Sequence, residues 1–162
     1  IDGGARKSKF IEYLARTGGE FNLTAKKLPF DNPDRIRSAV GKIAKKHDVD
    51  LFMFDFTRTR SENANDENLF QVVEEIKNSY VVDVMYGNYV ETFLPELFII
   101  IFTNENIKDY RKFLSADRWV PLSICSHNGD LAYLDFNEKR IPFTTFYEDL
   151  VKDIQNKQQT DF

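Results

Sequence analysis

The sequence predicts an α/β fold, in which a sheet of mainly parallel strands has helices on both faces. Two short and nearly continuous apolar runs, VDLFMFDF at 49–56 and ELFIIIFTN at 96–104, are typical of strands buried on both faces. Segments whose apolar residues recur at helical spacing lie before and between these runs, and they predict helices. Helices that alternate with buried strands favour a parallel sheet in the middle of a layered domain.

A short helix is predicted near the start of the chain, after Ser8. Its apolar residues at helical spacing are Phe10, Ile11 and Leu14. The sequence TGG at 17–19 supplies a stop for this helix. The next segment, FNLT at 21–24, fits a short strand.

Two more helices are predicted between this segment and the second buried run. The first begins at Asp31 or Asn32, before Pro33, and runs to about His47. Its apolar stripe consists of Ile36, Val40, Ile43 and Ala44. The other helix follows a polar loop at 57–68. Its apolar face consists of Leu69, Val72, Val73 and Ile76.

The segment VVDVMYGNYVETF at 81–93 predicts two strands that turn at Gly87 and Asn88. Further elements are predicted beyond Asn104. They are a helix at 105–114, a second hairpin at 119–136 with its turn at Asn128 and Gly129, and a C-terminal helix at 144–157.

Composition limits the possible classes of function. With 162 residues, of which 42% are hydrophobic, the chain can fill the core of one compact domain. The net charge of -4 excludes the overall cationic field of many stand-alone nucleic-acid-binding proteins, so a nucleic-acid contact needs a local patch. The single cysteine, Cys125, rules out an internal disulfide and fits a reducing nucleus or cytoplasm better than secretion. The longest apolar run, LFIIIF at 97–102, is too short to span a membrane, and we expect no membrane partner.

The opening stretch IDGGARKSKF has features of a phosphate-binding loop. Lys7 and Ser8 open a helix, as in G-x-x-x-x-G-K-[ST], although Arg6 stands where this pattern has its second glycine. Gly3 and Gly4 give the backbone amides freedom to converge on a phosphate. A strand normally precedes such a loop, and IDGG leaves no room for one. We therefore expect the chain to be a fragment that begins within the loop.

Polar residues end the two buried strands. A carboxylate at the position of Asp55 can hold Mg²⁺, directly or through water, or it can be simply the first solvated residue after the strand. Asn104 can hold an attacking water, or it can cap the following helix. Lys7, Asp55 and Asn104 follow one another at nearly equal spacing. This spacing fits successive strand–helix–strand units with one inserted hairpin.

Five stretches carry a resemblance to a known family. They are GGARKSKFIEYLA, LFMFDFTR, EEIKNSYVVDVMYGN, FIIIFTN and LSADRW. In these stretches the chain resembles the superfamily 3 helicase domain of replication-associated (Rep) proteins from circular single-stranded DNA viruses and related plasmids. The resemblance covers residues 1 to about 125 and implies a three-layer P-loop/AAA+-like fold with an inserted β-hairpin. Residues 1–162 would then be a single helicase/ATPase domain, without its upstream strand and any nicking domain.

The resemblance implies ATP hydrolysis with Mg²⁺ as cofactor. Lys7 would reach the β- and γ-phosphates, Ser8 and Asp55 would hold Mg²⁺, and Asn104 would orient the water. Arg118 would be an arginine finger for the nucleotide of a neighbouring subunit, or it would pair with a nearby acid. The implied nucleotide-binding residues are Gly3, Gly4, Arg6, Lys7, Ser8 and Lys9.

The implied partners are single-stranded DNA, with RNA not excluded, and further copies of the chain in a ring, commonly a hexamer. The hairpin would project into the channel of this ring, with Lys77, Tyr86 and Tyr89 contacting phosphates or bases. The segment 81–92 contains no lysine or arginine, and tyrosines in hairpins also serve cross-strand packing.

Two alternatives remain open. Arg6 and the acidic hairpin fit a nucleotide-binding or oligomerisation module of an integrated element, whose motor has decayed. The other alternative is a superfamily 3 helicase of an RNA virus, which acts on RNA. The segment LSADRW favours the DNA branch through resemblance.

Overall fold

The computed structural model describes residues 7–19, 22–56, 66–104, 123–127, 131–136, 139–142 and 152. The chain divides into two compact units, Ser8–Asn104 and Ile1–Lys7 with Glu105–Phe162. The first unit contains a parallel sheet, and the second contains a small antiparallel sheet. That residues 1–162 act as a single helicase domain stays a prediction.

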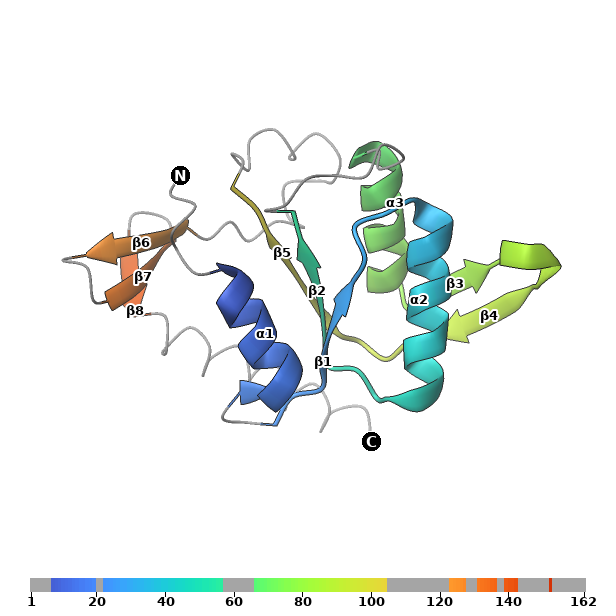
Figure 1. Ribbon diagram of the computed structural model, residues 1–162, viewed down its shortest axis with the longest axis horizontal. Helices are drawn as coiled ribbons and strands as arrows, with labels where there is room; N and C mark the ends of the chain where they lie inside the picture. The colour runs from blue at the N-terminus through green and yellow to red at the C-terminus, as the bar shows by residue number, and fades with distance from the viewer. Residues whose placement is uncertain are drawn as a thin grey trace. The chain divides into compact units, whose positions relative to one another are not determined.

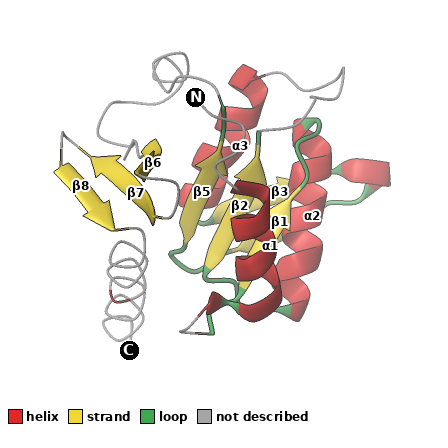
Figure 2. Ribbon diagram, turned by 60° about the vertical axis from the view of Figure 1, so that its left-hand side comes forward, coloured by secondary structure: helices red, strands yellow, loops and turns green. Residues whose placement is uncertain are grey.

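The unit Ser8–Asn104 is built around a three-stranded parallel sheet with the strand order β1-β2-β5. The strands are β1 (Ala25–Leu28), β2 (Leu51–Asp55) and β5 (Phe98–Phe102). Figures 1 and 2 show α1 (Lys7–Thr17) on one face of the sheet, and α2 (Pro33–Lys46) and α3 (Asp66–Lys77) on the other. The predicted α/β fold, with helices on both faces of a parallel sheet, is confirmed.

The central strand β2 forms the core of this unit. Its four apolar side chains are completely buried, as expected for a strand that has a neighbour on each side and helices on both faces. Just past the strand, Phe56 stacks on Phe30 with ring centroids 4.1 Å apart and meets Phe70 of α3 edge-on at 6.3 Å. These rings close the face of the sheet that α3 covers.

Strand β5 pairs with β2 in parallel, as predicted, but it is less buried than expected. Phe102 is buried, whereas the four residues before it are partly exposed. The prediction of a strand buried on both faces is therefore wrong for β5. Within the described residues β5 is the last strand in the sheet, so one of its edges has no strand beside it there.

Helix α2 begins and ends as its sequence predicts. Asn32 is the N-cap, since its side-chain oxygen accepts a hydrogen bond from the Arg35 N–H at 3.0 Å, and Pro33 follows as the first helical residue. The helix is tied to α3 by Arg37, whose guanidinium donates two hydrogen bonds to the carboxylate of Glu75, at 2.9 and 3.0 Å. This fork of hydrogen bonds fixes the two helices relative to each other.

Strand β1 lies later in the chain than predicted. The prediction of a strand at FNLT, 21–24, is wrong, because the strand is Ala25–Leu28. The connection before it contains Gly18, Gly19 and Asn22, with positive φ angles of 68°, 70° and 55°. Left-handed residues turn the chain, so the strand starts only after them. Lysine is uncommon in strands, so the two consecutive lysines of AKKL do not indicate a strand at this place in the sequence.

The hairpin of β3 (Tyr80–Asp83) and β4 (Val90–Phe93) follows α3 and projects past α2 (Figure 1). Its two antiparallel strands confirm the predicted pairing. The turn is longer than predicted, because Met85–Gly87 form a short 3-10 helix, η2. Tyr86 and Gly87 have positive φ angles of 56° and 73°. Tyr86 therefore stands at the tip in a conformation that side chains seldom adopt.

The second unit contains an antiparallel sheet of β6 (Ser123–His127), β7 (Leu131–Phe136) and β8 (Lys139–Pro142). The pairing of β6 with β7 confirms the two strands predicted within 119–136, and β8 is an element that the sequence analysis did not predict. The predicted helices at 105–114 and 144–157, and the turn at Asn128 and Gly129, lie outside the described residues, apart from Lys152, which is helical. Within the described ranges every helix is too short or too polar to cross a bilayer.

Candidate nucleotide site at the carboxyl edge of the sheet

Three of the predicted site residues lie near one edge of the sheet. Asp55 is the last residue of β2, and Asn104 comes two residues after the end of β5. Because these strands are parallel neighbours, their carboxyl ends meet at one edge. Ser8 is the second residue of α1, and the first turn of this helix contacts the end of β5: the rings of Phe10 and Phe102 meet edge-on at 6.0 Å. The start of α1 therefore lies at this edge too.

The strand register shows which side chains share a face. Asp55 lies opposite Phe102, and Lys27 of β1 lies opposite Met53. Since side chains alternate along a strand, Lys27, Asp55 and Phe102 all point to one face of the sheet. Phe102 contacts Phe10, so this is the face that α1 covers. The Asp55 carboxylate thus lies on the same face as the helix whose first residues are predicted to bind phosphate.

Asp55 is a buried acid, with a side chain that is only 3% exposed. The ammonium of Lys27 lies 3.8 Å from its Oδ2 and supplies a positive charge. A buried carboxylate is costly unless charges or hydrogen bonds compensate it. The alternative that Asp55 is simply the first solvated residue after β2 is therefore wrong, because the strand ends in the core.

The beginning of α1 is suited to an anion. The first N–H groups of a helix have no partner within the helix, and its dipole is positive at this end. Lys7 and Ser8 open α1, and both are partly exposed. Lys9 points to solvent along the helix, where its ammonium lies 3.2 Å from the Glu12 carboxylate and lowers the pKa of Glu12. Lys9 is thus occupied by a neighbour on its own helix.

Asn104 is exposed at the end of the connection that leaves β5. Its side chain is accessible from solvent, as a residue that holds a water must be. Its alternative role as a helix cap concerns residues that follow 104, which lie outside the described part of the chain. The predicted residues Gly3, Gly4, Arg6 and Arg118 also lie outside it.

The donors at this edge fit a magnesium nucleotide. Mg²⁺ prefers oxygen ligands and commonly takes only one or two carboxylates from the protein, together with phosphate oxygens and water. Asp55 offers such a carboxylate, and the Ser8 hydroxyl lies at the start of the helix on the same face. The described residues contain no cluster of three or more acidic, histidine or cysteine side chains, so an all-protein metal site is absent from them.

The predicted nucleic-acid contacts separate into two places. Tyr86 and Tyr89 lie on the hairpin and are 88% and 69% exposed. Lys77 instead ends α3, where its ammonium donates a 2.8 Å hydrogen bond to the Leu97 carbonyl and lies 5.7 Å from the centre of the Phe98 ring. Leu97 and Phe98 are at the amino end of β5, so Lys77 is held at the edge of the sheet opposite Asp55.

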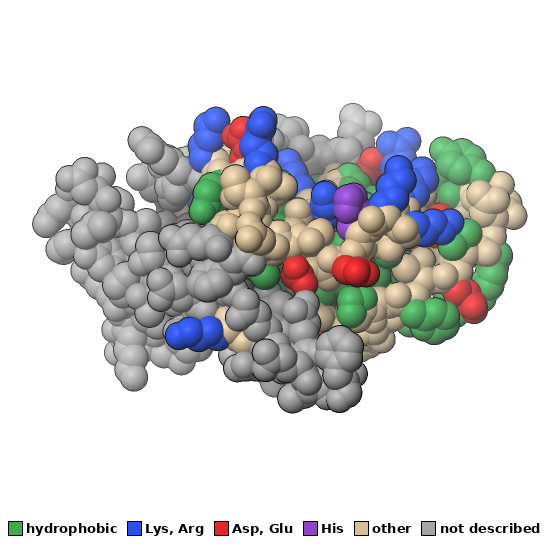
Figure 3. All heavy atoms as spheres, turned by 90° about the horizontal axis from the view of Figure 1, so that it is seen from below, with side chains coloured by type: hydrophobic (Ala, Val, Ile, Leu, Met, Phe, Trp, Pro, Cys, Tyr) green, Lys and Arg blue, Asp and Glu red, His purple; other side chains and the backbone are tan. Residues whose placement is uncertain are grey.

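The structure forms a mixed aromatic and basic surface that the sequence pattern does not indicate as one feature. Five of the six exposed large hydrophobic side chains in the described residues belong to the hairpin. They are Tyr80, Val84, Tyr86, Tyr89 and Phe93. The hairpin packs on α2, since a Cβ atom at Gly41 would lie 3.3 Å from Thr92 Oγ1. Figure 3 shows basic side chains next to the exposed hydrophobic ones on this side of the unit.

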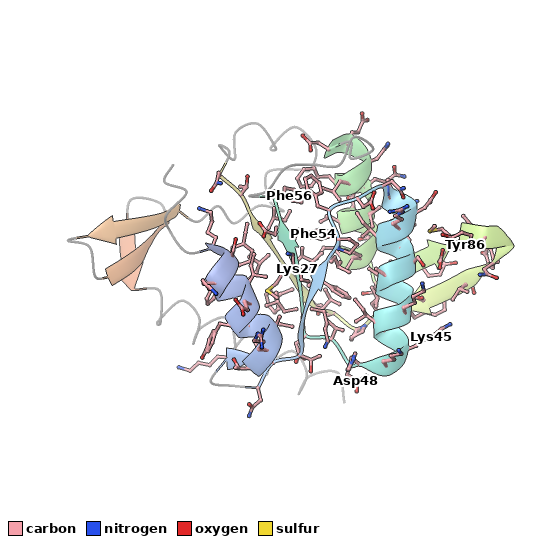
Figure 4. All side chains as sticks on the ribbon, viewed as in Figure 1. Lys27, Lys45, Asp48, Phe54, Phe56 and Tyr86 are labelled. Atoms are coloured by element: carbon pink, nitrogen blue, oxygen red, sulfur yellow. The ribbon has the colours of Figure 1, made fainter. Side chains whose placement is uncertain are left out.

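The basic part of this surface comes from the C-terminal half of α2. Its lysines are Lys42, Lys45 and Lys46, and all three are exposed. None of them takes part in an ion pair among the described residues. Figure 4 shows Lys45 at the end of α2, on the side where the hairpin with Tyr86 lies. We call these lysines with the hairpin aromatics the α2–hairpin surface.

The fold and the edge define the chain as an α/β domain with a parallel sheet, of the kind that can hold a nucleotide at the carboxyl ends of its strands. No protein-family model matches the chain, and no curated protein matches it. Any assignment of its activity therefore depends on the residues and their geometry.

Proposed function

We propose that this chain is the ATP-hydrolysing domain of a superfamily 3 helicase, of the type found in replication-associated proteins of circular single-stranded DNA viruses. The observation that carries the proposal is the meeting of the α1 N-terminus, Asp55 and the end of β5 at one edge of a parallel sheet. The order of these features along the chain is the order that the resemblance implies.

The proposed chemistry assigns one task to each residue. The first N–H groups of α1 and the Lys7 ammonium bind the phosphates, while Ser8 and Asp55 hold the metal ion. A bound Mg²⁺ withdraws charge from the phosphate oxygens. Asn104 orients a water, whose oxygen attacks the γ-phosphorus as the bond to the ADP oxygen breaks and a proton of the water passes to an oxygen of the transferred phosphate. Arg118 of a neighbouring subunit would stabilise the charge that develops in this step.

The test is ATP turnover by the full-length protein compared with its Lys7→Ala variant. We expect a loss of several powers of ten in turnover, because this ammonium would stabilise the transferred phosphoryl group by several kcal/mol. Arg16→Ala is the matched control: Arg16 is an exposed cation of the same helix that pairs with Glu12, and its loss should leave turnover unchanged.

Equal turnover in the wild-type and Lys7→Ala proteins would remove Lys7 from the site. Tight binding of ATP without turnover would instead support the alternative of a nucleotide-binding module with a decayed motor, which Arg6 in the loop favours. Melting curves with and without Mg-ATP measure binding separately from turnover.

We propose that the substrate of the motor is single-stranded nucleic acid, and that it contacts the α2–hairpin surface. Exposed aromatic rings next to unpaired lysines are the usual combination for a single strand, because bases stack on the rings and phosphates attract the lysines. This arrangement supports the proposal although the hairpin itself has no lysine or arginine. DNA is favoured over RNA by the resemblance, and assembly of several copies into a ring belongs to the same proposal.

A further inference from the structure

Lys27 and Asp55 face each other across two neighbouring strands. Lys27 is opposite Met53 in the register, and Asp55 lies two residues further along β2, so all three side chains are on the α1 face. The Lys27 Nζ atom lies 3.8 Å from Asp55 Oδ2. Figure 4 shows Lys27 on β1, directly beside β2. The sheet itself therefore fixes the starting points of both side chains.

The two partners differ in their exposure. The Asp55 side chain is 3% exposed, whereas the Lys27 side chain is 49% exposed. A carboxylate with so little access to water needs a positive charge or hydrogen bonds nearby. Lys27 provides such a charge and keeps its ammonium at the border of the solvent.

The geometry lets the ammonium leave without disturbing the core. A separation of 3.8 Å is longer than a hydrogen bond, which spans about 2.7–3.2 Å between nitrogen and oxygen. The lysine stem has four rotatable bonds, and half of the side chain already contacts solvent. The Lys27 ammonium can therefore turn outward while β1 stays in place.

We propose that Lys27 is a counter-ion of Asp55 in the metal-free protein, and that its ammonium competes with a divalent cation for this carboxylate. The proposal rests on the proposed function, because it takes Asp55 as the carboxylate that holds Mg²⁺. Two cations at one buried carboxylate repel each other, so the arriving metal displaces the ammonium toward solvent. Lys27 is therefore a positioning residue that acts through Asp55. It sets the concentration of divalent cation that is needed before a nucleotide binds.

The first test measures Mn²⁺, a spectroscopic substitute for Mg²⁺, with the full chain in the absence of nucleotide. Electron paramagnetic resonance of the free ion gives the dissociation constant for the wild-type and Lys27→Met proteins. We expect Lys27→Met to bind Mn²⁺ about 1.5- to five-fold more tightly, which is the range expected for a half-exposed ion pair. The same shift should lower the Mn²⁺ concentration at which a fluorescent ADP analogue binds.

Two variants serve as controls. Lys26→Met removes the adjacent lysine of β1, which faces the other side of the sheet and has no ion pair within the described residues, and its Mn²⁺ affinity should equal that of the wild type. Lys27→Arg keeps the positive charge and should also bind Mn²⁺ with nearly the wild-type affinity. Equal affinity in the wild-type and Lys27→Met proteins would overturn the role of Lys27 and leave Asp55 as a metal ligand.

Melting temperatures in metal-free buffer give a second test that needs no bound metal. Lys27→Met should melt at a lower temperature than the wild type, because the buried Asp55 carboxylate then loses the positive charge of Lys27. The double variant Lys27→Met/Asp55→Asn should recover part of this loss, since a neutral amide needs no counter-ion. A double variant as unstable as Lys27→Met would contradict the proposal. If no form of the protein binds Mn²⁺ or responds to it with nucleotide, the metal site and the proposed function both fail.

Discussion

One carboxylate orders two tyrosines on the exposed hairpin. The hydroxyls of Tyr80 and Tyr89 donate to the same oxygen of Glu91, at 2.8 and 3.3 Å. The Tyr80 ring lies beside Phe93, with ring centroids 5.1 Å apart. The hydrogen bond to Glu91 raises the pKa of Tyr80 to about 12, because deprotonation loses this bond and puts a second negative charge beside the carboxylate.

This contact predicts a pH dependence of the hairpin. Folding favours the neutral form of Tyr80, so its contribution to stability is full below pH 10 and is lost as the pH rises from 10 to about 12. Titration of the tyrosinate ultraviolet absorbance should show a late step from Tyr80. This step should vanish in Tyr80→Phe and move toward pH 10.0 in Glu91→Ala. A late step that persists in both variants would assign it to another tyrosine.

At the scale of single residues, the sequence predicts those positions that depend only on the neighbouring residues in the chain. The position of Asp55 at the end of β2 follows from the four apolar residues before it, and Asn32 as a cap follows from the proline after it. The ion pair of Lys27 with Asp55 depends on how two strands align, which a local pattern does not contain. The same holds for Lys77, whose partner is a backbone carbonyl near β5.

At the scale of elements, two turns each contain a glycine with a left-handed backbone, and they differ in the space around that glycine. Gly18 after α1 and Gly87 in η2 have nearly the same φ, 68° and 73°. A Cβ atom at Gly18 would lie 2.1 Å from the Leu23 carbonyl oxygen, whereas at Gly87 it would meet nothing within 4 Å. The two positions therefore share the left-handed backbone and differ in the space around it.

We expect Gly87→Ala to lower the free energy of unfolding by about 1 kcal/mol, the usual cost of a left-handed alanine. Gly18→Ala should lower the free energy of unfolding by about 2–4 kcal/mol, because the turn before β1 must also shift. Urea denaturation of both variants measures the difference. Equal losses would show that the segment after α1 relaxes without cost, and that the tight turn does not fix the start of β1.

The elements that the sequence predicts well are those with a strong periodic pattern. The face of α3 and the strand β2 are where their apolar spacing puts them. On α2 the predicted stripe is confirmed for Ile36 and Val40, whereas Ile43 and Ala44 are partly exposed. The start of β1 was missed because left-handed residues delay it and because AKKL alternates poorly between apolar and polar residues. A lysine fits there because its charge reaches the end of the neighbouring strand, which no propensity scale represents.

At the scale of the whole unit Ser8–Asn104, the charge and the exposed aromatics are distributed unevenly. The total charge of the chain is negative, yet the C-terminal half of α2 presents three exposed lysines, and the hairpin packs on the same half of the helix at Gly41. The lysines and the tyrosines are far apart in the sequence and become one surface only because α2 packs on β4 at Gly41. Composition alone therefore could not predict this surface.

The α2–hairpin surface can be tested by its salt dependence. We expect the triple variant with Lys42, Lys45 and Lys46 each changed to Gln to bind single-stranded DNA more weakly. The slope of log affinity against log salt should be shallower by about 2, since each phosphate contact contributes roughly 0.7.

Tyr86→Ala should instead lose about 1–3 kcal/mol of binding free energy per stacked base and keep the wild-type slope. Fluorescence anisotropy of a labelled oligonucleotide without ATP measures both. Arg16→Gln is the control, because it removes an exposed cation of α1, which lies on the opposite face of the sheet. An unchanged slope in the triple variant would place the phosphates elsewhere, whereas a Tyr86→Ala protein with full affinity would limit the tyrosines to packing within the hairpin.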